Sequence, residues 1–512
     1  MNENPISSFF QNFTNRQLLV ANVVIAVLYF LAISLWFPRG NPWLFGILVA
    51  SQVFYTWQLL TYIYTIWNTE HEPVKDPEFA PGVDVFITVA GEPVEIVEET
   101  ALAAKAMEYP NFEIYLLNDG YVAGKENWRD IEHLARRIGV HCITRTEAGG
   151  AKAGNINNAL RRTYNPFVVI FDADHVPHAD FLKETMGYFA DTQLAYVQSP
   201  QYYKNHEENM VTGGSWEQQS LFFGPICKGK NRLNSVTMCG TNMVIRRTAL
   251  EEAGGMCDTN IAEDFVTGLF IHDNGWKSIY VPKVLAEGLA PEDFLSYYKQ
   301  QFRWARGSLE VLFKYNPLFR SGLSWAQKIQ YVASASFYVS GLFVLLNALI
   351  PLAFFFTGAV PFAISTMTLT LIFLPYIFLS IYNLQLSCNF GYTFRALSFS
   401  IGQWPIHIKA LLAVLTNQKS SFAITSKKKL EGNFVSLVTP HLAYIVLVII
   451  GVGVAFAREG LTPSLITNAS WALFYIAIFT PFIKAALPQA EKAKVPALQM
   501  APLKAQSKHL SI

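Results

Sequence analysis

Charged residues are scarce in this chain, and long parts of it have none. Asp, Glu, Lys and Arg make up 15% of the 512 residues, against about 25% in an average soluble domain. The 39 basic and 38 acidic residues leave a formal net charge of +1, so no strong overall field recruits nucleic acid. With 52% hydrophobic residues, the composition excludes a disordered chain, a nucleic-acid coat and a highly acidic tail protein.

Cysteine and the common phosphate-binding motifs are also missing or rare. The five cysteines are odd in number and include no CxxC pair, so we expect neither a zinc site nor a disulfide framework. No GxGxxG turn and no Walker P-loop occurs in the sequence. A glycine-rich cradle for a dinucleotide or for ATP is therefore not indicated.

The charge-free positions gather in five stretches, residues 17–38, 40–69, 329–394, 432–457 and 461–483. A membrane helix needs about 20 mostly apolar residues, and the third stretch is long enough for two. A single stretch of this kind could be a buried soluble helix, but the whole set favours a membrane protein. The sequence predicts spans near residues 18–37, 43–66, 330–356, 361–384, 438–457 and 466–485.

No small-residue cleavage site follows the first span, so a cleaved signal peptide is not expected.

The basic residues predict the orientation of the protein in the membrane. Two spans before the long middle segment and four after it place that segment on the same side as Lys427, Lys428 and Lys429 and as the basic tail at 487–512. Positive residues prefer the cytoplasmic side. We expect a multi-pass membrane protein with the middle segment and both termini in the cytoplasm.

The middle segment has the pattern of an α/β domain. Short apolar runs at 83–89, 112–117 and 167–171 alternate with helical stretches at 96–107 and 127–138. Such alternation predicts a mostly parallel sheet. The fold class expected is therefore a multi-pass α-helical membrane protein with a cytoplasmic α/β domain.

Acidic residues follow these strands, where ligands bind in parallel sheets. Glu92, Asp119, Asp172 and Asp174 occupy such positions. In an extended segment, Asp172 and Asp174 share one side, so both can approach one Mg²⁺ or Mn²⁺ and a diphosphate. A lone Asp-x-Asp is more often a solvated turn, but the strand before it and the other strand-end acids favour a metal site.

Two later motifs have ordinary explanations when each is taken alone. Glu263 and Asp264 precede a helix and could simply complement its dipole. Gln300, Arg303 and Trp304 follow another predicted helix, and the Arg-Trp pair could be an anchor at the membrane surface.

Taken together, the motifs resemble those of a known family. Asp119, Asp172-Ala173-Asp174, Glu263-Asp264 and Gln300-x-x-Arg303-Trp304 resemble the D, DxD, TED, QxxRW signature of processive family-2 glycosyltransferases of the cellulose synthase type. Order and spacing agree across roughly residues 82–305. Lesser matches are Lys152-Ala153-Gly154-Asn155, Gln198-Ser199-Pro200-Gln201 and Cys239-Gly240-Thr241-Asn242. The run at 422–427 resembles the FxVTxK gating loop of bacterial cellulose synthases, which hyaluronan and chitin synthases do not typically carry.

The resemblance implies a domain organisation. Residues 1–70 would hold an amphipathic segment and two spans, and 71–305 a GT-A-like glycosyltransferase domain. Residues 306–486 would hold interfacial helices, four spans and a gating loop at 417–430, and 487–512 a basic cytoplasmic tail. Within the third part, the stretch 394–415, interrupted by Pro405, reads as an amphipathic helix at the interface.

The resemblance also implies residue roles. Asp264 would be the general base, with Glu263 beside it. Trp304, Cys239 and Gly240 would contact the acceptor, and Asp172 and Asp174 would hold the divalent cation. The donor would be bound by Thr88, Glu92, Asp119, Lys152, Asp172, Asp174, Gln300 and Arg303, and the gating loop would act through Phe422, Thr425 and Lys427.

The function implied is a processive, inverting transferase that makes a β-glucan from UDP-glucose and translocates it across the membrane, which by this resemblance would be the bacterial inner membrane. The expected partners are the UDP-sugar, the growing polysaccharide and membrane lipid, without nucleic acid. Accessory subunits and oligomeric state stay open. Three alternatives also stay open: a synthase using UDP-N-acetylglucosamine, a non-processive transferase acting on a polyprenyl phosphate, and a transporter with an inactive domain.

Three departures from the family pattern affect these expectations. The first strand ends in Val89-Ala90-Gly91-Glu92 where the family usually has a Thr-Tyr-Asn-Glu-like stretch, Ala262 replaces the Thr of TED, and nothing after the last span resembles a PilZ domain. Polar residues in the spans could line a channel for the polymer, or could be interfacial aromatics and caps. These residues are Tyr331, Asn347, Tyr376, Tyr382, Asn383 and Gln385.

Overall fold

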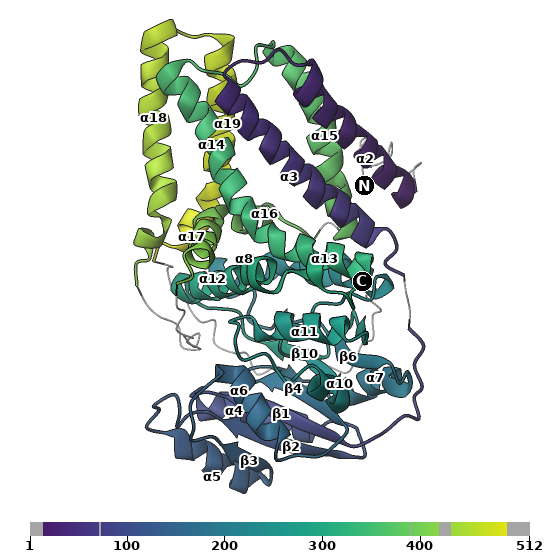
Figure 1. The fold of residues 1–512 in the computed structure, drawn as a ribbon. Helices are drawn as coiled ribbons and strands as arrows, with labels where there is room; N and C mark the ends of the chain where they lie inside the picture. Colours follow the sequence, from purple (N-terminus) through teal and green to yellow (C-terminus); the bar gives the residue numbers. More distant parts are fainter. Residues whose placement is uncertain (1–13, 71–72, 390, 419–431, 489–512) are drawn as a thin grey trace, which may run out of the picture.

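The computed structural model describes residues 14–70, 73–389, 391–418 and 432–488. Long helices form one end of the molecule and a β-sheet the other, with a layer of helices between them that includes α8, α12, α13, α16 and α17 (Figure 1). The predicted gating-loop residues Phe422, Thr425 and Lys427 lie outside the described residues.

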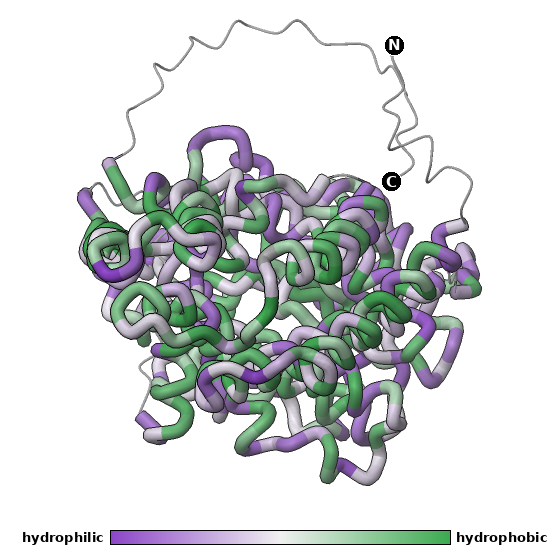
Figure 2. The backbone as a smooth tube through the Cα atoms, turned by 90° about the horizontal axis from the view of Figure 1, so that it is seen from above, coloured by the Kyte–Doolittle hydropathy of each residue, from purple (hydrophilic) through white to green (hydrophobic). Residues whose placement is uncertain are grey.

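In the described part of the chain, six helices are long and apolar enough to cross a membrane. This agrees in number with the sequence prediction, and the bounds differ by a few residues. Hydrophobic positions recur around the helices when the molecule is viewed from above (Figure 2), and Val446, Ile449 and Leu473 are exposed on them. The candidate spans are Asn15–Trp36, Pro42–Ile66, Trp325–Thr357, Met367–Ser387, Val435–Glu459 and Pro463–Ala485.

These spans correspond to a few named helices. α2 (Asn15–Leu31) and α3 (Pro42–Ile66) precede the sheet domain, and the rest follow it. Polar caps define several starts: the Asn41 side chain accepts from the first amides of α3, and Ser324 forms a capping box at α13. The later helices are α13 (Trp325–Ser336), α14 (Ser340–Thr357), α15 (Thr366–Ser387), α18 (Thr439–Glu459) and α19 (Pro463–Ala485).

The predicted interfacial stretch forms two helices. α16 (Phe394–Gly402) and α17 (Trp404–Leu415) meet at Gln403. Pro405 sits in the first turn of α17, where its missing N–H costs no helical hydrogen bond. The interruption predicted from Pro405 is therefore confirmed, and it falls between two helices.

A seven-stranded sheet of the order β3-β2-β1-β4-β8-β6-β9 forms the core of the soluble part. The pairs among β1 to β4 are parallel, while β8 runs antiparallel to both of its neighbours. The prediction of a mostly parallel sheet is confirmed. The strands are β1 (Val83–Val89), β2 (Phe112–Asn118), β3 (His141–Thr144), β4 (Phe167–Asp172), β6 (Leu194–Gln198), β8 (Met243–Arg246) and β9 (Lys277–Tyr280).

Shorter elements surround this sheet. A small sheet of the order β5-β10-β7 joins Val176–Pro177, Ala286–Gly288 and Tyr202–Tyr203. The helices are α4 (Val94–Lys105), α5 (Trp128–Ile138), α6 (Ala151–Leu160), α7 (Phe181–Thr185), α8 (Met210–Leu221), α9 (Cys227–Arg232), α10 (Arg247–Glu252), α11 (Glu263–Asp273) and α12 (Phe294–Glu310).

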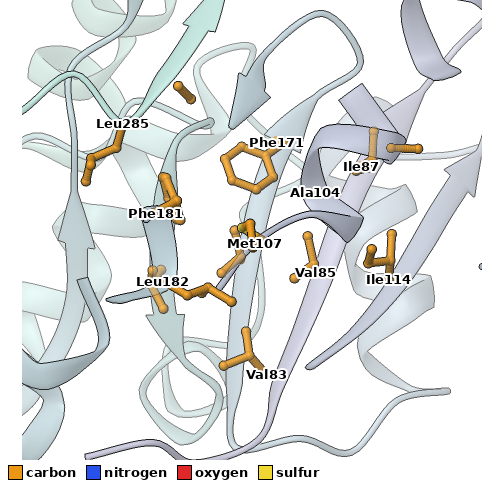
Figure 3. Packing of buried hydrophobic residues seen from close by; sticks show 14 of the residues in the cluster. Val83, Val85, Ile87, Ala104, Met107, Ile114, Phe171, Phe181, Leu182 and Leu285 are labelled. Atoms are coloured by element: carbon orange, nitrogen blue, oxygen red, sulfur yellow. The ribbon is translucent and has the colours of Figure 1, made fainter. Parts of the chain in front are cut away.

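Every residue of β1 is buried, because both faces of the sheet are covered. Val83, Val85 and Ile87 pack in one cluster that includes Phe171 of β4 and Phe181 of α7 (Figure 3). On the other face, Phe86 and Ile170 pack with residues of α6. This double cover explains why these strands read as continuous apolar runs, and it holds the strand ends in fixed positions.

One expectation needs correction. Gln300, Arg303 and Trp304 lie inside α12 and do not follow a helix, because the Asp293 side chain caps Ser296 N at 2.8 Å and the helix then runs unbroken to Glu310.

Tyr331, one of the polar residues considered for a channel, is 3% exposed, and its hydroxyl lies 2.7 Å from His272 Nδ1 of α11.

Candidate active site

The carboxyl ends of β1, β2 and β4 meet at one edge of the sheet. Thr88 pairs in register with Asp172, and Val89 with Asn118. The Asp119 amide then donates to the Val89 carbonyl at 2.7 Å. Parallel pairing therefore brings side chains that are far apart in the sequence to one place.

A cavity of about 350 Å³ opens at this edge. It is lined by all the residues of the described chain that the sequence analysis selected for catalysis, donor binding and acceptor binding; their roles stay predictions. They are Thr88, Glu92, Asp119, Lys152, Asp172, Asp174, Cys239, Gly240, Glu263, Asp264, Gln300, Arg303 and Trp304.

Arg145 is a cavity residue that the sequence analysis missed. Its guanidinium donates two hydrogen bonds to the Asp119 carboxylate, from Nε to Oδ1 at 2.7 Å and from Nη2 to Oδ2 at 2.5 Å. It also donates to the Gly149 and Ala151 carbonyls. Such a two-point ion pair fixes the plane of a carboxylate. Arg145 directly follows β3, so recognition of that short strand would have identified it as another strand-end residue.

Lys152 and Asp172 form a half-buried ion pair on the cavity wall. Lys152 Nζ donates to Asp172 Oδ1 and, at 2.8 Å, to the Gly240 carbonyl. Burial alone would raise the pKa of Asp172, but Lys152 outweighs it and holds that pKa below its ordinary value. Burial opposes the charge on Lys152 too, yet the nearby carboxylates, Asp172 first, raise its pKa. Both groups are therefore charged at neutral pH.

Lys152 lies in the first turn of α6, whose amino-terminal end borders the cavity. Gly149, Ala151 and Lys152 line the cavity there, and Gly150 caps the helix in a left-handed conformation. Amides and dipole at a helix start favour an anion. Together with Lys152, this end of α6 suits a phosphate group.

Asp174 is 2% exposed and lies deeper in the cavity wall. The Leu289 amide donates to its Oδ2 at 3.3 Å, and His175 Nδ1 lies 3.6 Å from its Oδ1. His175 also lines the cavity and was not selected from the sequence. The small sheet thus supports Asp174, because β10 ends one residue before Leu289.

The donor set suits a divalent cation that is shared with a ligand. Among the described residues, no group of three or more His, Cys, Asp or Glu side chains could hold a metal ion alone. Asp172 and Asp174 can supply two carboxylates, with the remaining positions left to phosphate oxygens and water. This is the arrangement that Mg²⁺ commonly adopts with nucleotides, so the residues fit the predicted metal.

Glu263 and Asp264 begin α11 and line the same cavity as the strand-end residues. Burial raises the pKa of Asp264 to about 7, and the adjacent Glu263 carboxylate adds to the rise. Burial also raises the pKa of Glu263. A carboxylate with a pKa near neutral pH can accept a proton from a substrate during the reaction.

The raised pKa of Asp264 predicts the pH dependence of activity. A general base must be deprotonated, so the rate should increase with pH through about 7. In Glu263→Gln the like charge is gone, the pKa of Asp264 falls, and the acidic limb should move to lower pH. Initial rates of nucleotide release between pH 5 and 9 measure the acidic limb in the wild-type protein and in the variant. If the acidic limb does not move in Glu263→Gln, the group that titrates in the pH–rate profile is not Asp264.

Gly240 lies against Asp264. Its backbone has φ +77°, and a Cβ there would stand 2.9 Å from Asp264 Oδ2. Gly254 has a similar φ of +88° but nothing within 4 Å of such a Cβ. The two glycines therefore carry the same conformational demand but differ in their surroundings.

This contrast gives a matched pair of variants. Gly240→Ala and Gly254→Ala should each lose about 1–2 kcal/mol of stability from the left-handed conformation. Only Gly240→Ala should also lower the rate, by about tenfold or more, because the methyl group displaces the Asp264 carboxylate. Thermal unfolding and initial rates test both effects. Equal rate losses in the two variants would contradict the proximity argument.

One face of α12 closes the cavity. Gln300, Arg303 and Trp304 have the spacing that aligns side chains on a helix, and all three line the cavity. Gln300 Oε1 is buried without a hydrogen-bond partner, so it can accept from a ligand hydroxyl. α12 packs on α13 and α17, which places this wall of the cavity next to the membrane helices.

The chain matches two families. Residues 81–307 match the family described as "Glycosyltransferase like family 2", and residues 251–501 match "Cellulose synthase". Cellulose synthase catalytic subunit [UDP-forming] of Pseudomonas fluorescens is 30% identical over 486 residues, which are 90% of this chain and 65% of that protein. The protein of the same name from Xanthomonas axonopodis pv. citri is 36% identical over 56% of this chain and 40% of its own length. The chain thus spans less than two thirds of these relatives.

A solved structure shares the fold. Mannosyltransferase PcManGT from Pyrobaculum calidifontis, in complex with GDP-Man and Mn²⁺, aligns with a TM-score of 0.54 and 17% identity over 73% of this chain and 99% of that one. This similarity confirms the GT-A-like fold expected for the sheet domain. The two family matches, which together run from residue 81 to residue 501, and the curated relatives show that the chain belongs to the family-2 glycosyltransferases of the cellulose synthase type.

Proposed function

We propose that this protein is a processive, inverting glycosyltransferase that polymerises a β-glucan from UDP-glucose and moves it across the membrane. The observation that carries the proposal is the convergence of strand-end acids, Lys152, Arg303 and the half-buried Asp264 on one cavity. The name "Cellulose synthase catalytic subunit [UDP-forming]" of two relatives supports the same reaction.

On this proposal, the donor lies along the strand ends. Asp119, held by Arg145, would meet the nucleoside, and Thr88 and Glu92 line the same cavity. Lys152, Arg303 and the start of α6 would hold the diphosphate. A Mg²⁺ or Mn²⁺ ion on Asp172 and Asp174 would neutralise charge on the leaving diphosphate.

Asp264 would act as the general base. It would accept the proton of the acceptor hydroxyl while that oxygen attacks the anomeric carbon from the face opposite the UDP group, which leaves with the bonding electrons. One displacement inverts the anomeric centre and needs no covalent intermediate. Trp304, Cys239 and Gly240 line the cavity where the end of the acceptor would lie, and an indole face suits a sugar ring.

The six candidate spans would then carry the product. A buried hydroxyl without a partner costs several kcal/mol, so a neutral polysaccharide needs a protein path through the bilayer. On the proposed topology the cavity and both termini face the bacterial cytoplasm, where UDP-sugars are made. The gating-loop role of Phe422, Thr425 and Lys427 also stays a prediction.

The test is a donor panel with the purified full chain. UDP-glucose, UDP-N-acetylglucosamine and other UDP-sugars are each supplied with Mg²⁺ or Mn²⁺, and UDP release and product are measured. The expected result is polymer from UDP-glucose, sensitive to a β-glucan hydrolase. Polymer from UDP-N-acetylglucosamine alone, or only short lipid-linked product, would support the alternatives and contradict the proposal.

A further inference from the structure

A buried polar cluster lies behind the acid pair and outside the cavity. Its members are Asn260, Arg306 and Glu310, which are at most 8% exposed. Glu310 Oε2 accepts from Asn260 Nδ2 at 3.1 Å, and its Oε1 accepts from Arg306 Nε at 3.4 Å. The cluster joins the loop before α11 to the last turns of α12.

Asn260 controls the backbone immediately before the acid pair. Its Oδ1 accepts from the Ala262 amide at 2.7 Å, and Ala262 is the residue directly before Glu263 at the start of α11. The turn is pressed against α12 at the same point, since a Cβ on Gly307 would stand 2.4 Å from the Ala262 Cβ. The side-chain bond and the tight packing together set where α11 begins.

The cluster extends to the interfacial helices. Arg306 Nη2 donates to the carbonyl of Gln418, three residues beyond the end of α17. Glu310 also pairs with Lys314 at 3.2 Å, and the Lys314 side chain is 43% exposed. A continuous series of contacts thus runs from Gln418 through Arg306, Glu310 and Asn260 to Ala262.

Charges as buried as those of Arg306 and Glu310 are a costly way to hold two helices together. Replacement of a buried pair by packed hydrophobic side chains is often neutral or stabilising. The Glu310 carboxylate has two acceptor oxygens and fixes the orientation of both of its partners. One oxygen accepts from Asn260 and the other from Arg306. This orients the Asn260 amide so that its oxygen, rather than its nitrogen, faces the Ala262 amide.

We infer that Asn260, Arg306 and Glu310 are positioning residues that hold the Asp264 carboxylate in place for the acceptor and link that place to the end of α17. The inference rests on the proposed function for its kinetic consequence but not for its structural one. None of the three residues lines the cavity, so they should act on the turnover number and not on donor affinity.

The test exploits the polarity of the Asn260–Glu310 bond. In Asn260→Asp two carboxylates face each other, and in Glu310→Gln one amide N–H₂ must face another donor, Asn260 or Arg306. In the double variant Asn260→Asp/Glu310→Gln the bond is restored with donor and acceptor exchanged, and Asp at 260 still accepts from the Ala262 amide. Each single change should lower the kcat for UDP release about tenfold, because small displacements of a reacting group are costly.

The expected pattern is rescue. The double variant should return to within about threefold of the wild-type kcat, and the donor KM should stay within about twofold throughout. Additive losses in the double variant, or a raised KM with unchanged kcat, would overturn the inference. Lys314→Met is the matched control: it removes the exposed partner of the same carboxylate and should change neither parameter.

Hydrogen exchange gives a readout that does not need activity. The Ala262 amide should exchange faster in both single variants and regain protection in the double variant, whether or not any donor is turned over. Loss of protection without recovery would overturn the positioning role. If the wild-type protein releases no UDP from any donor while the exchange pattern is as expected, the proposed function fails and the structural linkage stands.

Discussion

Asp264→Asn is expected to lower polymer synthesis by about a thousandfold, within the range that general-base groups contribute. The amide has nearly the same shape as the carboxylate but cannot accept the acceptor's proton. Asp264 is half-buried at the start of α11, and the Phe265 amide donates to its Oδ1 at 2.7 Å, which fixes the position of the carboxylate. Radiolabel incorporation from the donor measures the loss.

Stability provides the control for Asp264→Asn. The pKa of this carboxyl in the folded protein is raised to about 7, so the folded state binds its proton more tightly than the unfolded state. The contribution of protonated Asp264 to the free energy of unfolding is therefore lost as pH rises from about 4 through 7. Asn does not titrate, so the variant does not lose stability in this way. The variant should unfold at the same or a higher temperature than wild type at pH 8. A lower unfolding temperature together with lost activity would point to misfolding rather than chemistry.

Asp174→Asn should have the second largest effect, a loss of about a hundredfold or more with a raised requirement for the divalent cation. Asp174 is 2% exposed, and the Leu289 amide donates to its Oδ2. The carboxylate is therefore held in a fixed orientation in which it could coordinate the cation. Asp172 is a poorer test, because its loss would also leave the half-buried Lys152 without its carboxylate partner. Initial rates against Mg²⁺ and Mn²⁺ concentration measure the effect.

A nearby acid controls for the Asp-to-Asn change itself. Asp180 lies just before α7 and pairs with Lys283 on the surface at 2.6 Å. Asp180→Asn should alter neither the rate nor the cation requirement. If Asp174→Asn also leaves the half-saturating cation concentration unchanged, Asp174 is not a metal ligand.

Much of the strand-end side of the cavity could be predicted, because it follows from strands with strong hydrophobic signals. The bounds of β1 were predicted as 83–89 and observed as Val83–Val89. Acids placed directly after such strands must gather at one sheet edge. Asp119 and Asp172 could therefore be placed without knowledge of any contact.

The rest depends on contacts that leave no local pattern. β3 has four residues, of which Ile143 alone is buried, so it gave no hydrophobic run and Arg145 was missed. Glu310 meets Asn260 across fifty positions of sequence, and neither residue belongs to a recognised motif. Gln300 and Trp304 line the cavity, but their place inside α12 depends on a cap at Asp293 that lies seven residues before Gln300.

The central claim is that one chain both makes and exports the polymer. The most direct test is reconstitution of the purified protein in lipid vesicles, selected for the orientation that exposes the sheet domain to the outside. UDP-glucose and Mg²⁺ are then added externally. The account predicts polymer that an external β-glucan hydrolase cannot digest until detergent opens the vesicles, and none with Asp264→Asn. Polymer that is fully digested outside intact vesicles would contradict export through the spans.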